Sequence, residues 1–247
     1  MNNTIQSLWI GNKVSIVEKL SMASFIHNEN NYHLYTYNEI PDLPEGVKVF
    51  DANEILPEEE VFCYQTSVGK GSYAAFSNYF RYKLLYEKGG FWADTDNVCL
   101  KKFDFNDDYV FGMEFAVLYN NHPITHHVAS GLFKAPKKSP IMLDNYKECL
   151  TKDKNLLKWG EVGPALVAKC IKKFNIFNYV KSAHFFNPIG YNEVGNFVSE
   201  NTSRIIDLSE SYSVHLWNEC WRKNGLDKNK SYHPSSIFEK LKKAYLQ

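Results

Sequence analysis

The stretch from residue 71 to residue 100 constrains the fold more than any other part of the chain, because it predicts a helix followed directly by a strand. Phe76, Phe80 and Leu84 recur at four-residue spacing, which is typical of a buried helical stripe. Ser72 is a suitable N-cap, and the double glycine after the stripe supplies the left-handed residue that ends a helix. A short apolar strand follows and leads into two acidic residues. The stretch therefore indicates a helix packed against a sheet.

The first fifty residues read as strand, helix, strand and strand, an alternation that indicates a layered α/β sheet. We expect strands at 5–10, 32–37, 47–50, 109–115, 128–134, 204–207 and 213–217, and helices around 16–23, 139–150, 164–174 and 235–246. Neither a repeat nor a long linker divides the chain, and 44% of its residues are hydrophobic, which is enough for one large core. The prediction is a single domain over residues 1–247, with the helix 235–246 packed on it.

The balance of charge and the cysteines narrow the class of protein. Lys and Arg together number 28, as do Asp and Glu, so no basic field exists to hold a nucleic acid. The five cysteines are never spaced as C-x-x-C, which predicts neither a disulfide framework nor a thiolate zinc site. No stretch approaches the roughly 20 apolar residues that cross a bilayer. We expect a cytoplasmic protein, with contact between the basic helix 235–246 and the inner face of a membrane as the alternative.

Asp94 and Asp96 are the candidate metal ligands. Side chains alternate across a strand, so two acids two residues apart at a strand end are expected to point the same way. A hard cation such as Mn²⁺ or Mg²⁺ prefers oxygen ligands and keeps positions open for water and phosphates. The pair therefore predicts a divalent-cation site that receives a phosphate group. Taken alone, an acid-x-acid triplet is more often a solvated turn, so the neighbouring residues decide between these interpretations.

Two polar residues on the preceding helix support the functional interpretation. Asn78 and Arg81 lie three residues apart and so share a helical face, which differs from that of the apolar stripe. An amide and a guanidinium are thus directed away from the core. The alternative is an exposed surface pair, or an arginine that bridges to a nearby acid.

The central stretch SYAAFSNYFRYKLLYEKGGFWADTDN resembles the DXD-containing sugar-transferase signature of glycosyltransferase family 32 and of the related glucosylating clostridial toxins. That signature reads approximately A-S-D-x-x-R-x-x-x-L-x-x-x-G-G-x-Y-x-D-x-D. The matching positions are Ser77, Arg81, Leu85, Gly89, Gly90, Asp94 and Asp96, and Trp92 takes the aromatic position. The strong part of the resemblance is confined to this stretch, and weaker similarities occur toward both ends of the chain.

Three shorter segments are also similar to the family. SLWIG resembles its N-terminal I-W-x-G strand, which makes Trp9, Ile10 and Gly11 candidates for nucleotide binding, with the indole stacked on the base. Gly163-Pro164 matches a turn that opens a helix and faces an acceptor or a phosphate. VHLWNECWR resembles a late H-x-W-x-x-S-W segment near the metal and diphosphate, and its candidates are His215, as a metal or phosphate partner, Trp217, Asn218 and Trp221. The alternatives are a core aromatic at Trp9 and a structural histidine at the late segment.

The resemblance implies a GT-A type, Rossmann-like nucleotide-binding fold with a mixed central sheet flanked by helices, and transfer with retention of anomeric configuration. The implied reaction moves a hexose from a nucleotide sugar, with a UDP-sugar favoured, to a saccharide or lipid-linked glycan in bacterial capsule or lipopolysaccharide synthesis. Asp96 would hold Mn²⁺ or Mg²⁺, and Asp94 would contact the ribose or sugar and the metal shell. Arg81 would add positive charge near the leaving group. Ser77 and Asn78 are candidates for donor-sugar binding.

Two positions depart from the family pattern. Asn78 stands where the family has an acid that bonds hydroxyls of the donor sugar. Because an amide donates as well as accepts, we expect the preferred donor sugar to differ. Cys220 stands where a serine is usual, so no hydroxyl role is predicted at that position.

Other interpretations stay open at this point. A haloacid-dehalogenase-like phosphatase also uses an acid-x-acid pair, but its motif lies on the first strand and has a threonine where this chain has Val98. A catalytically silent module that binds a nucleotide sugar would keep the same fold. His122, His126 and His127 are a third alternative, as a zinc site, although Pro123 disfavours the helix that their spacing requires. A loop near the acceptor is the simpler interpretation of these histidines.

Overall fold

The computed structural model describes all residues except 1–2, 66–68, 117–124 and 203–205. The strands are β1 (Ile5–Trp9), β2 (Tyr32–Thr36), β3 (Lys48–Asp51), β4 (Gly90–Ala93), β5 (Asn97–Cys99), β6 (Val110–Ala116), β7 (Thr125–Ala135), β8 (Val180–Lys181) and β9 (Ser213–His215). The α-helices are α1 (Ile16–His27), α2 (Ala74–Lys88), α3 (Pro140–Leu150), α4 (Pro164–Phe174), α5 (Ala183–Phe186), α6 (Asn218–Lys223) and α7 (Ile237–Tyr245). Short 3₁₀ helices are η1 (Ala52–Glu54), η2 (Glu58–Glu60), η3 (Phe177–Tyr179) and η4 (Tyr191–Phe197).

A seven-stranded sheet forms the centre of the described chain, with the strand order β3-β2-β1-β4-β7-β6-β8. β1 pairs in parallel with β2 and with β4, and β2 pairs in parallel with β3. β7 runs antiparallel to both β4 and β6, so the sheet is mixed. The parallel strands β1 and β4 lie side by side and end at one edge, which is where α/β sheets of this kind bind ligands.

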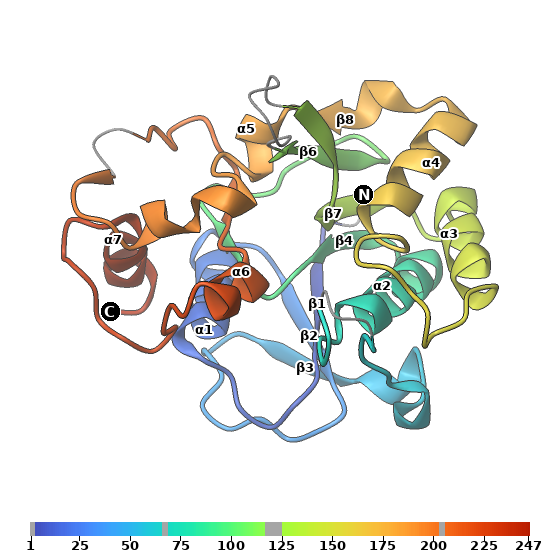
Figure 1. Ribbon diagram of the computed structural model, residues 1–247, viewed down its shortest axis with the longest axis horizontal. Helices are drawn as coiled ribbons and strands as arrows, with labels where there is room; N and C mark the ends of the chain where they lie inside the picture. Colours follow the sequence, from blue (N-terminus) through green and yellow to red (C-terminus); the bar gives the residue numbers. More distant parts are fainter. Residues whose placement is uncertain (1–2, 66–68, 117–124, 203–205) are drawn as a thin grey trace.

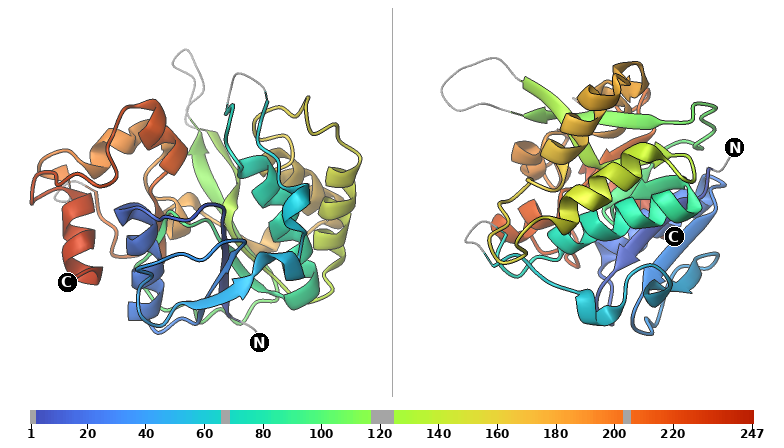
Figure 2. Two further views of the ribbon diagram at one scale, coloured as in Figure 1. Left: turned by 90° about the horizontal axis from the view of Figure 1, so that it is seen from below. Right: turned by 90° about the vertical axis from the view of Figure 1, so that its right-hand side faces the viewer.

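Helices cover both faces of the sheet (Figure 1). On one face α2 contacts β1, β4 and β7, α4 contacts β7, and α3 packs on α2 and α4. Figure 2 shows α1 and α7 on the opposite side from α2 and α3, and α1 also contacts β5 of the small β5–β9 sheet. This layered arrangement confirms the predicted α/β fold with a mixed central sheet flanked by helices.

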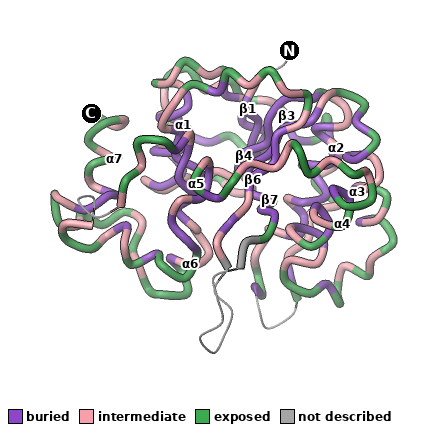
Figure 3. The backbone as a smooth tube through the Cα atoms, turned by 90° about the horizontal axis from the view of Figure 1, so that it is seen from above, coloured by how far each residue is buried: buried purple, intermediate pink, exposed green. Residues whose placement is uncertain are grey.

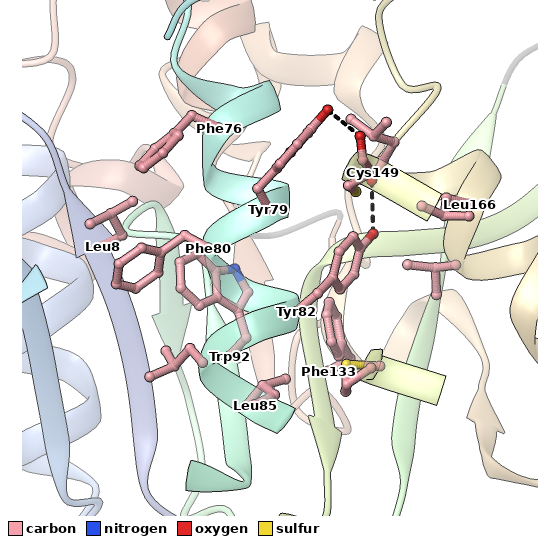
Figure 4. Close-up of a cluster of buried hydrophobic side chains, with 14 of the residues drawn as sticks. Leu8, Phe76, Tyr79, Phe80, Tyr82, Leu85, Trp92, Phe133, Cys149 and Leu166 are labelled. Carbon is pink, nitrogen blue, oxygen red and sulfur yellow. Dashed lines mark hydrogen bonds between the residues drawn. The ribbon is translucent and has the colours of Figure 1, made fainter. Parts of the chain in front are cut away.

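The apolar core between α2 and the sheet is drawn in Figure 4. Phe76, Phe80 and Leu84 are buried, as their spacing predicted. Phe80 lies beside Trp92 of β4, with 6.3 Å between the ring centroids. Gly89 ends the helix with a φ of 69°, a conformation that favours glycine. Figure 3 shows that β1 and β4 are largely buried, so α2 delivers the chain directly into the interior.

The C-terminal helix α7 packs on α1. Ile237, Phe238 and Leu241 are buried in one apolar cluster with Val17 and Leu20 of α1. Within the described residues, no helix combines the length and the apolar character that crossing a membrane requires.

Two local predictions are wrong. The helix α2 begins one residue later than expected, because Tyr73 occupies the N-cap position, although the Ser72 hydroxyl still accepts a backbone N–H at 3.3 Å. The strand expected at 204–207 lies partly outside the described residues. Its described part is a turn rather than a strand, since the Asp207 carboxylate accepts the Ser209 N–H at 2.9 Å.

Candidate active site

Asp94 and Asp96 lie on the turn between β4 and β5, and not on a strand as the sequence suggested. Alternation along a strand therefore does not explain why their carboxylates converge. The turn explains it, because the Asp94 N–H donates to the Gly131 carbonyl at 2.7 Å and the Asn97 N–H donates to the Asp94 carbonyl at 3.0 Å. The chain reverses within three residues and directs both acids to one side.

The β5–β9 ladder brings a third residue to these acids. Asn97 pairs with His215, so the end of β9 lies next to the turn that carries Asp96. The His215 Nε2 atom is 3.0 Å from Asp96 Oδ1. The Asn218 N–H donates to Asp96 Oδ2 at 2.7 Å, which occupies the second carboxylate oxygen. Pairing between remote strands thus assembles the site.

Asp94, Asp96 and His215 form the candidate metal site. One ligand atom from each lies within 4.8 Å of the others. Two carboxylates and an imidazole suit a divalent cation such as Mn²⁺, and this incomplete shell leaves positions for phosphate oxygens. His215 is buried, and its Nδ1 atom has no hydrogen-bond partner among the residues that the structure describes. The donor set and the orphaned nitrogen therefore fit a divalent cation.

The electrostatics of the three groups differ. Burial raises the pKa of the Asp94 carboxyl, and the Arg81 guanidinium opposes this shift. Burial alone would also raise the pKa of Asp96, but the attraction of His215 and the Asn218 N–H hold it below the ordinary value. Burial would lower the pKa of His215, yet its contact with Asp96 raises it. A cation that binds at this site competes with the proton that Asp96 favours on His215.

Arg81 is a buried cation that anchors Asp94. Its Nη2 atom donates to Asp94 Oδ1 and to Ser77 Oγ, each at 2.8 Å. Its Nε atom donates to the Ser77 carbonyl at 3.2 Å, and its Nη1 atom donates to the Ser130 carbonyl. The guanidinium lies 4.7 Å from the centroid of Trp92, whose Nε1 also donates to Asp94 Oδ1 at 2.8 Å. The arginine therefore bridges to an acid in the interior, and the serine orients the arginine.

Asn78 is also buried, so the interpretation of Asn78 and Arg81 as an exposed pair is wrong. Its Nδ2 atom donates to the Ala74 carbonyl at 2.8 Å, and its Oδ1 atom has no hydrogen-bond partner in the described part of the chain. Gly163, at the start of α4, lies so close that an added Cβ would come within 3.3 Å of the Asn78 amide and 3.1 Å of Ser130 Oγ. The unpaired oxygen is an acceptor suited to a ligand hydroxyl, because leaving it unpaired costs free energy.

Trp9, Ile10 and Gly11 follow one another at the end of β1, which neighbours β4. They therefore lie at the same sheet edge as the Asp94 turn. Trp9 is half-buried, and its Nε1 atom donates to the Lys13 carbonyl at 3.0 Å. Ile10 packs against the core beside α2, and Gly11 has a φ of 135°, which favours glycine.

The residues of the segment 214–222 lie partly at the site and partly in the apolar core. Trp217 packs on His215, with 3.9 Å between the ring centroids, and takes a left-handed φ of 58°. Asn218 joins the site through its backbone N–H. Trp221 is fully buried instead, 4.9 Å from Phe238 of α7 between ring centroids. The structure therefore brings three of the four predicted residues to the acids and leaves Trp221 in the core.

Glu18 and Gly131 are site neighbours that the sequence reasoning missed. Glu18 is fully buried, and its Oε1 atom accepts from Asn218 Nδ2 at 2.8 Å. The Ser15-x-x-Glu18 spacing was visible, but such a capping box marks only the start of a helix. Gly131 lies within a register shift of the β6–β7 ladder, between Val128 and Phe133, and its carbonyl accepts the Asp94 N–H. No local sequence pattern predicts that register shift.

Gly131 leaves room for the metal site, which we expect Gly131→Ala to close. An added Cβ would lie 2.9 Å from His215 Cε1 and 3.1 Å from Asp94 Oδ2. Both side chains would have to move, so we expect Mn²⁺ affinity, measured by calorimetry, to fall about tenfold. Gly195→Ala is the matched control, because a Cβ there meets nothing within 4 Å. Equal Mn²⁺ affinity in the two variants would show that the ligands are not constrained at Gly131.

The histidines of the β6–β7 hairpin give no support to a zinc site among the described residues. His122 lies outside the described residues, and the side chain of His126 is not described. His127 pairs with Glu114 at 2.5 Å between Nε2 and Oε1. This contact with the cross-strand neighbour raises the pKa of His127 despite its partial burial.

The sequence was then compared with known proteins. Residues 13–112 match the family model described as the glycosyltransferase sugar-binding region containing a DXD motif. The matched region begins after the end of β1, and it contains α2, Arg81, Asp94 and Asp96. The part of the chain that carries Arg81, Asp94 and Asp96 is therefore similar to the DXD sugar-binding region of glycosyltransferases, which confirms the resemblance seen in its sequence. A comparison with the curated proteins gives no match.

Solved structures of glycosyltransferases are among those similar to this chain. The PaToxG glycosyltransferase is 18% identical, with 70% of each chain covered and a TM-score of 0.49. The galactosyltransferase LgtC, solved in complex with donor and acceptor sugar analogs, is 11% identical, with 86% of each chain covered and a TM-score of 0.47. We assign the class of enzyme from the family match and the geometry of the site.

Proposed function

We propose that this glycosyltransferase binds a nucleotide-sugar donor through a divalent cation held by Asp94, Asp96 and His215, and transfers the sugar to an acceptor hydroxyl. The observation that supports this most strongly is the convergence of these three ligands within 4.8 Å. They lie beside the carboxyl ends of β1 and β4, the edge at which such sheets bind nucleotides. The family match covers the segment that carries both acids.

The residues around the proposed cation site have different expected roles in catalysis. Asp94, Asp96 and His215 would hold the cation, which would supply positive charge next to the departing diphosphate. Asp96 is held by His215 and by a backbone N–H, and so is oriented before the donor arrives. Asp94 keeps one oxygen bound to Arg81, which leaves the other for the cation or the ribose. Arg81 supplies fixed positive charge next to the leaving group.

The donor sugar would lie between α2 and the start of α4. The unpaired Asn78 Oδ1 and the Ser130 hydroxyl are adjacent there, next to Gly163. A hexose offers hydroxyls that both donate and accept, which matches an amide better than a carboxylate. We propose a UDP-hexose as donor, a saccharide or lipid-linked glycan as acceptor, retention of configuration, and a role in bacterial capsule or lipopolysaccharide synthesis.

A thermal-shift panel of nucleotide sugars, with and without Mn²⁺, tests this function. A cognate donor at about 100 times its Kd should raise the Tm by about 5–10 °C, and only when Mn²⁺ is present. Release of free sugar from that donor would then separate an enzyme from a silent binding module. A panel in which no nucleotide sugar changes the Tm would contradict the proposal.

Trp9 is proposed to stack on the nucleotide base, and Trp9→Ala tests this role. Base–aromatic stacking is worth about 1–3 kcal/mol, so calorimetry should show UDP or GDP binding about 5- to 150-fold weaker. The control is Phe177→Ala, because Phe177 is an exposed aromatic residue in η3 that takes no part in the site. Unchanged nucleotide affinity in Trp9→Ala would remove the indole from the site.

A further inference from the structure

Glu18 is a buried carboxylate in the first turn of α1 and has no exposed surface. A charge in that position needs several partners, because an unpaired buried ion is very costly. Glu18 Oε2 accepts the Ser15 N–H at 2.6 Å, while Oε1 accepts from Asn218 Nδ2 at 2.8 Å and from Lys228 Nζ at 3.0 Å. A capping box explains only the first of these bonds.

The other two bonds join α1 to the segment that carries the metal site. Asn218 donates in two directions, through its side chain to Glu18 and through its backbone N–H to Asp96 Oδ2 at 2.7 Å. One residue therefore stands between the buried carboxylate and the proposed metal ligand. The bond from Asn218 to Glu18 thus joins the start of α6 to the first turn of α1.

The turn formed by Trp217 and Asn218 has an uncommon backbone conformation. Trp217 adopts a left-handed φ of 58°, which is uncommon for a bulky residue. The same turn places its indole on His215 and directs the next backbone N–H to Asp96. Beyond α6 the chain returns to α1, where Asn229 Oδ1 accepts the Ile16 N–H at 3.1 Å. The segment that follows Trp217 is thus fastened to α1 at the start of α6 and again beyond its end.

We propose that Glu18 is a positioning residue for the metal site, which fixes Asn218 and thereby the orientation of the Asp96 carboxylate. This inference rests on the proposed function, because it assumes that Asp96 binds the cation. Glu18 does not touch the cation or the donor. It acts through Asn218, in the way that outer partners of metal ligands commonly hold those ligands in place.

The test compares Glu18→Gln with Glu239→Gln. Glu239 is a matched control in α7: it also stands three residues after a serine N-cap, accepts the Tyr232 N–H at 2.8 Å and pairs with Lys242 at 2.7 Å. A purely structural role predicts that the two variants differ only in Tm. A positioning role predicts that Glu18→Gln also weakens Mn²⁺ binding to the complex of protein and UDP by about tenfold, as measured by calorimetry.

A second variant decides the question if Glu18→Gln fails to fold. Asn218→Ala keeps the backbone N–H on Asp96 but removes the bond to Glu18, so it should weaken Mn²⁺ binding by a similar factor. Mn²⁺ affinity within twofold of wild type in either folded variant would overturn the inference. If wild-type protein fails to bind Mn²⁺ with UDP, the proposed function itself fails, so the two failures are distinguishable.

Discussion

Asp96→Ala should abolish sugar release from the cognate nucleotide sugar, with a loss of about 1,000-fold or more. The substitution removes a metal ligand and leaves His215 and the Asn218 N–H without the carboxylate that both contact. A catalytic cation contributes several kcal/mol to charge stabilisation, and each 1.36 kcal/mol is tenfold in rate. The assay is hydrolysis of the donor in Mn²⁺, followed as free sugar.

Two further variants serve as a conservative substitution and as a control for this prediction. Asp96→Asn keeps the shape and one acceptor oxygen, so it should fold normally and still lose most of the Mn²⁺ dependence. Asp104→Ala removes an exposed acid outside the site and should behave as wild type. If Asp96→Ala keeps ordinary activity while EDTA is present, the metal interpretation is wrong.

Arg81→Met should reduce both stability and catalysis. Its side chain is 3% exposed and bonds Asp94, Ser77 and the Ser130 carbonyl, so removal of the guanidinium leaves a carboxylate without its cation. We expect a loss of about 3 kcal/mol in the free energy of unfolding, measured by urea denaturation. Loss of fixed charge beside the leaving group should lower kcat by about 100-fold or more.

The pH dependence gives a second readout for this arginine. Burial already raises the pKa of Asp94, and Arg81 opposes that shift, so Arg81→Met should raise the pKa further. Metal-dependent donor binding, which needs the ionised acid, should then be lost at a higher pH than in wild type. Arg81→Lys keeps the positive charge but lacks the planar guanidinium group. We therefore expect this variant to retain the wild-type pH profile more fully than the wild-type kcat. A folded Arg81→Met enzyme with wild-type kcat and pH profile would contradict this role.

Local sequence patterns predicted the helices and strands, but they did not predict how the site residues are brought together. The buried face of α2 that includes Phe76 and the end of this helix at Gly89 were predicted correctly, because both depend on residues close together in the sequence. Asp94 and Asp96 were identified as a pair for the wrong reason, since they lie on a turn held by Gly131 of another strand. Backbone bonding between remote segments decides that geometry, and a single sequence does not display it.

The same limit applies to the polar residues around the acids. Spacing identified Arg81 as a candidate but left an exposed surface pair as an alternative, whereas both Asn78 and Arg81 are buried. Glu18 carried only a helix-capping signal, because its partners Asn218 and Lys228 are some 200 positions away. Trp221 matched a family pattern but faces the core against α7, which depends on how the last helix packs.

The central claim is that Asp94, Asp96 and His215 bind a nucleotide diphosphate through a divalent cation. Calorimetric titration of UDP and GDP into the protein, in Mn²⁺ and again in EDTA, tests it most directly. We predict that one of the two nucleotides binds once per chain in Mn²⁺, at least about tenfold more weakly in EDTA, and that Asp96→Ala shows the weak binding in both. Equal affinity with and without Mn²⁺, or no binding of either nucleotide, would contradict the claim.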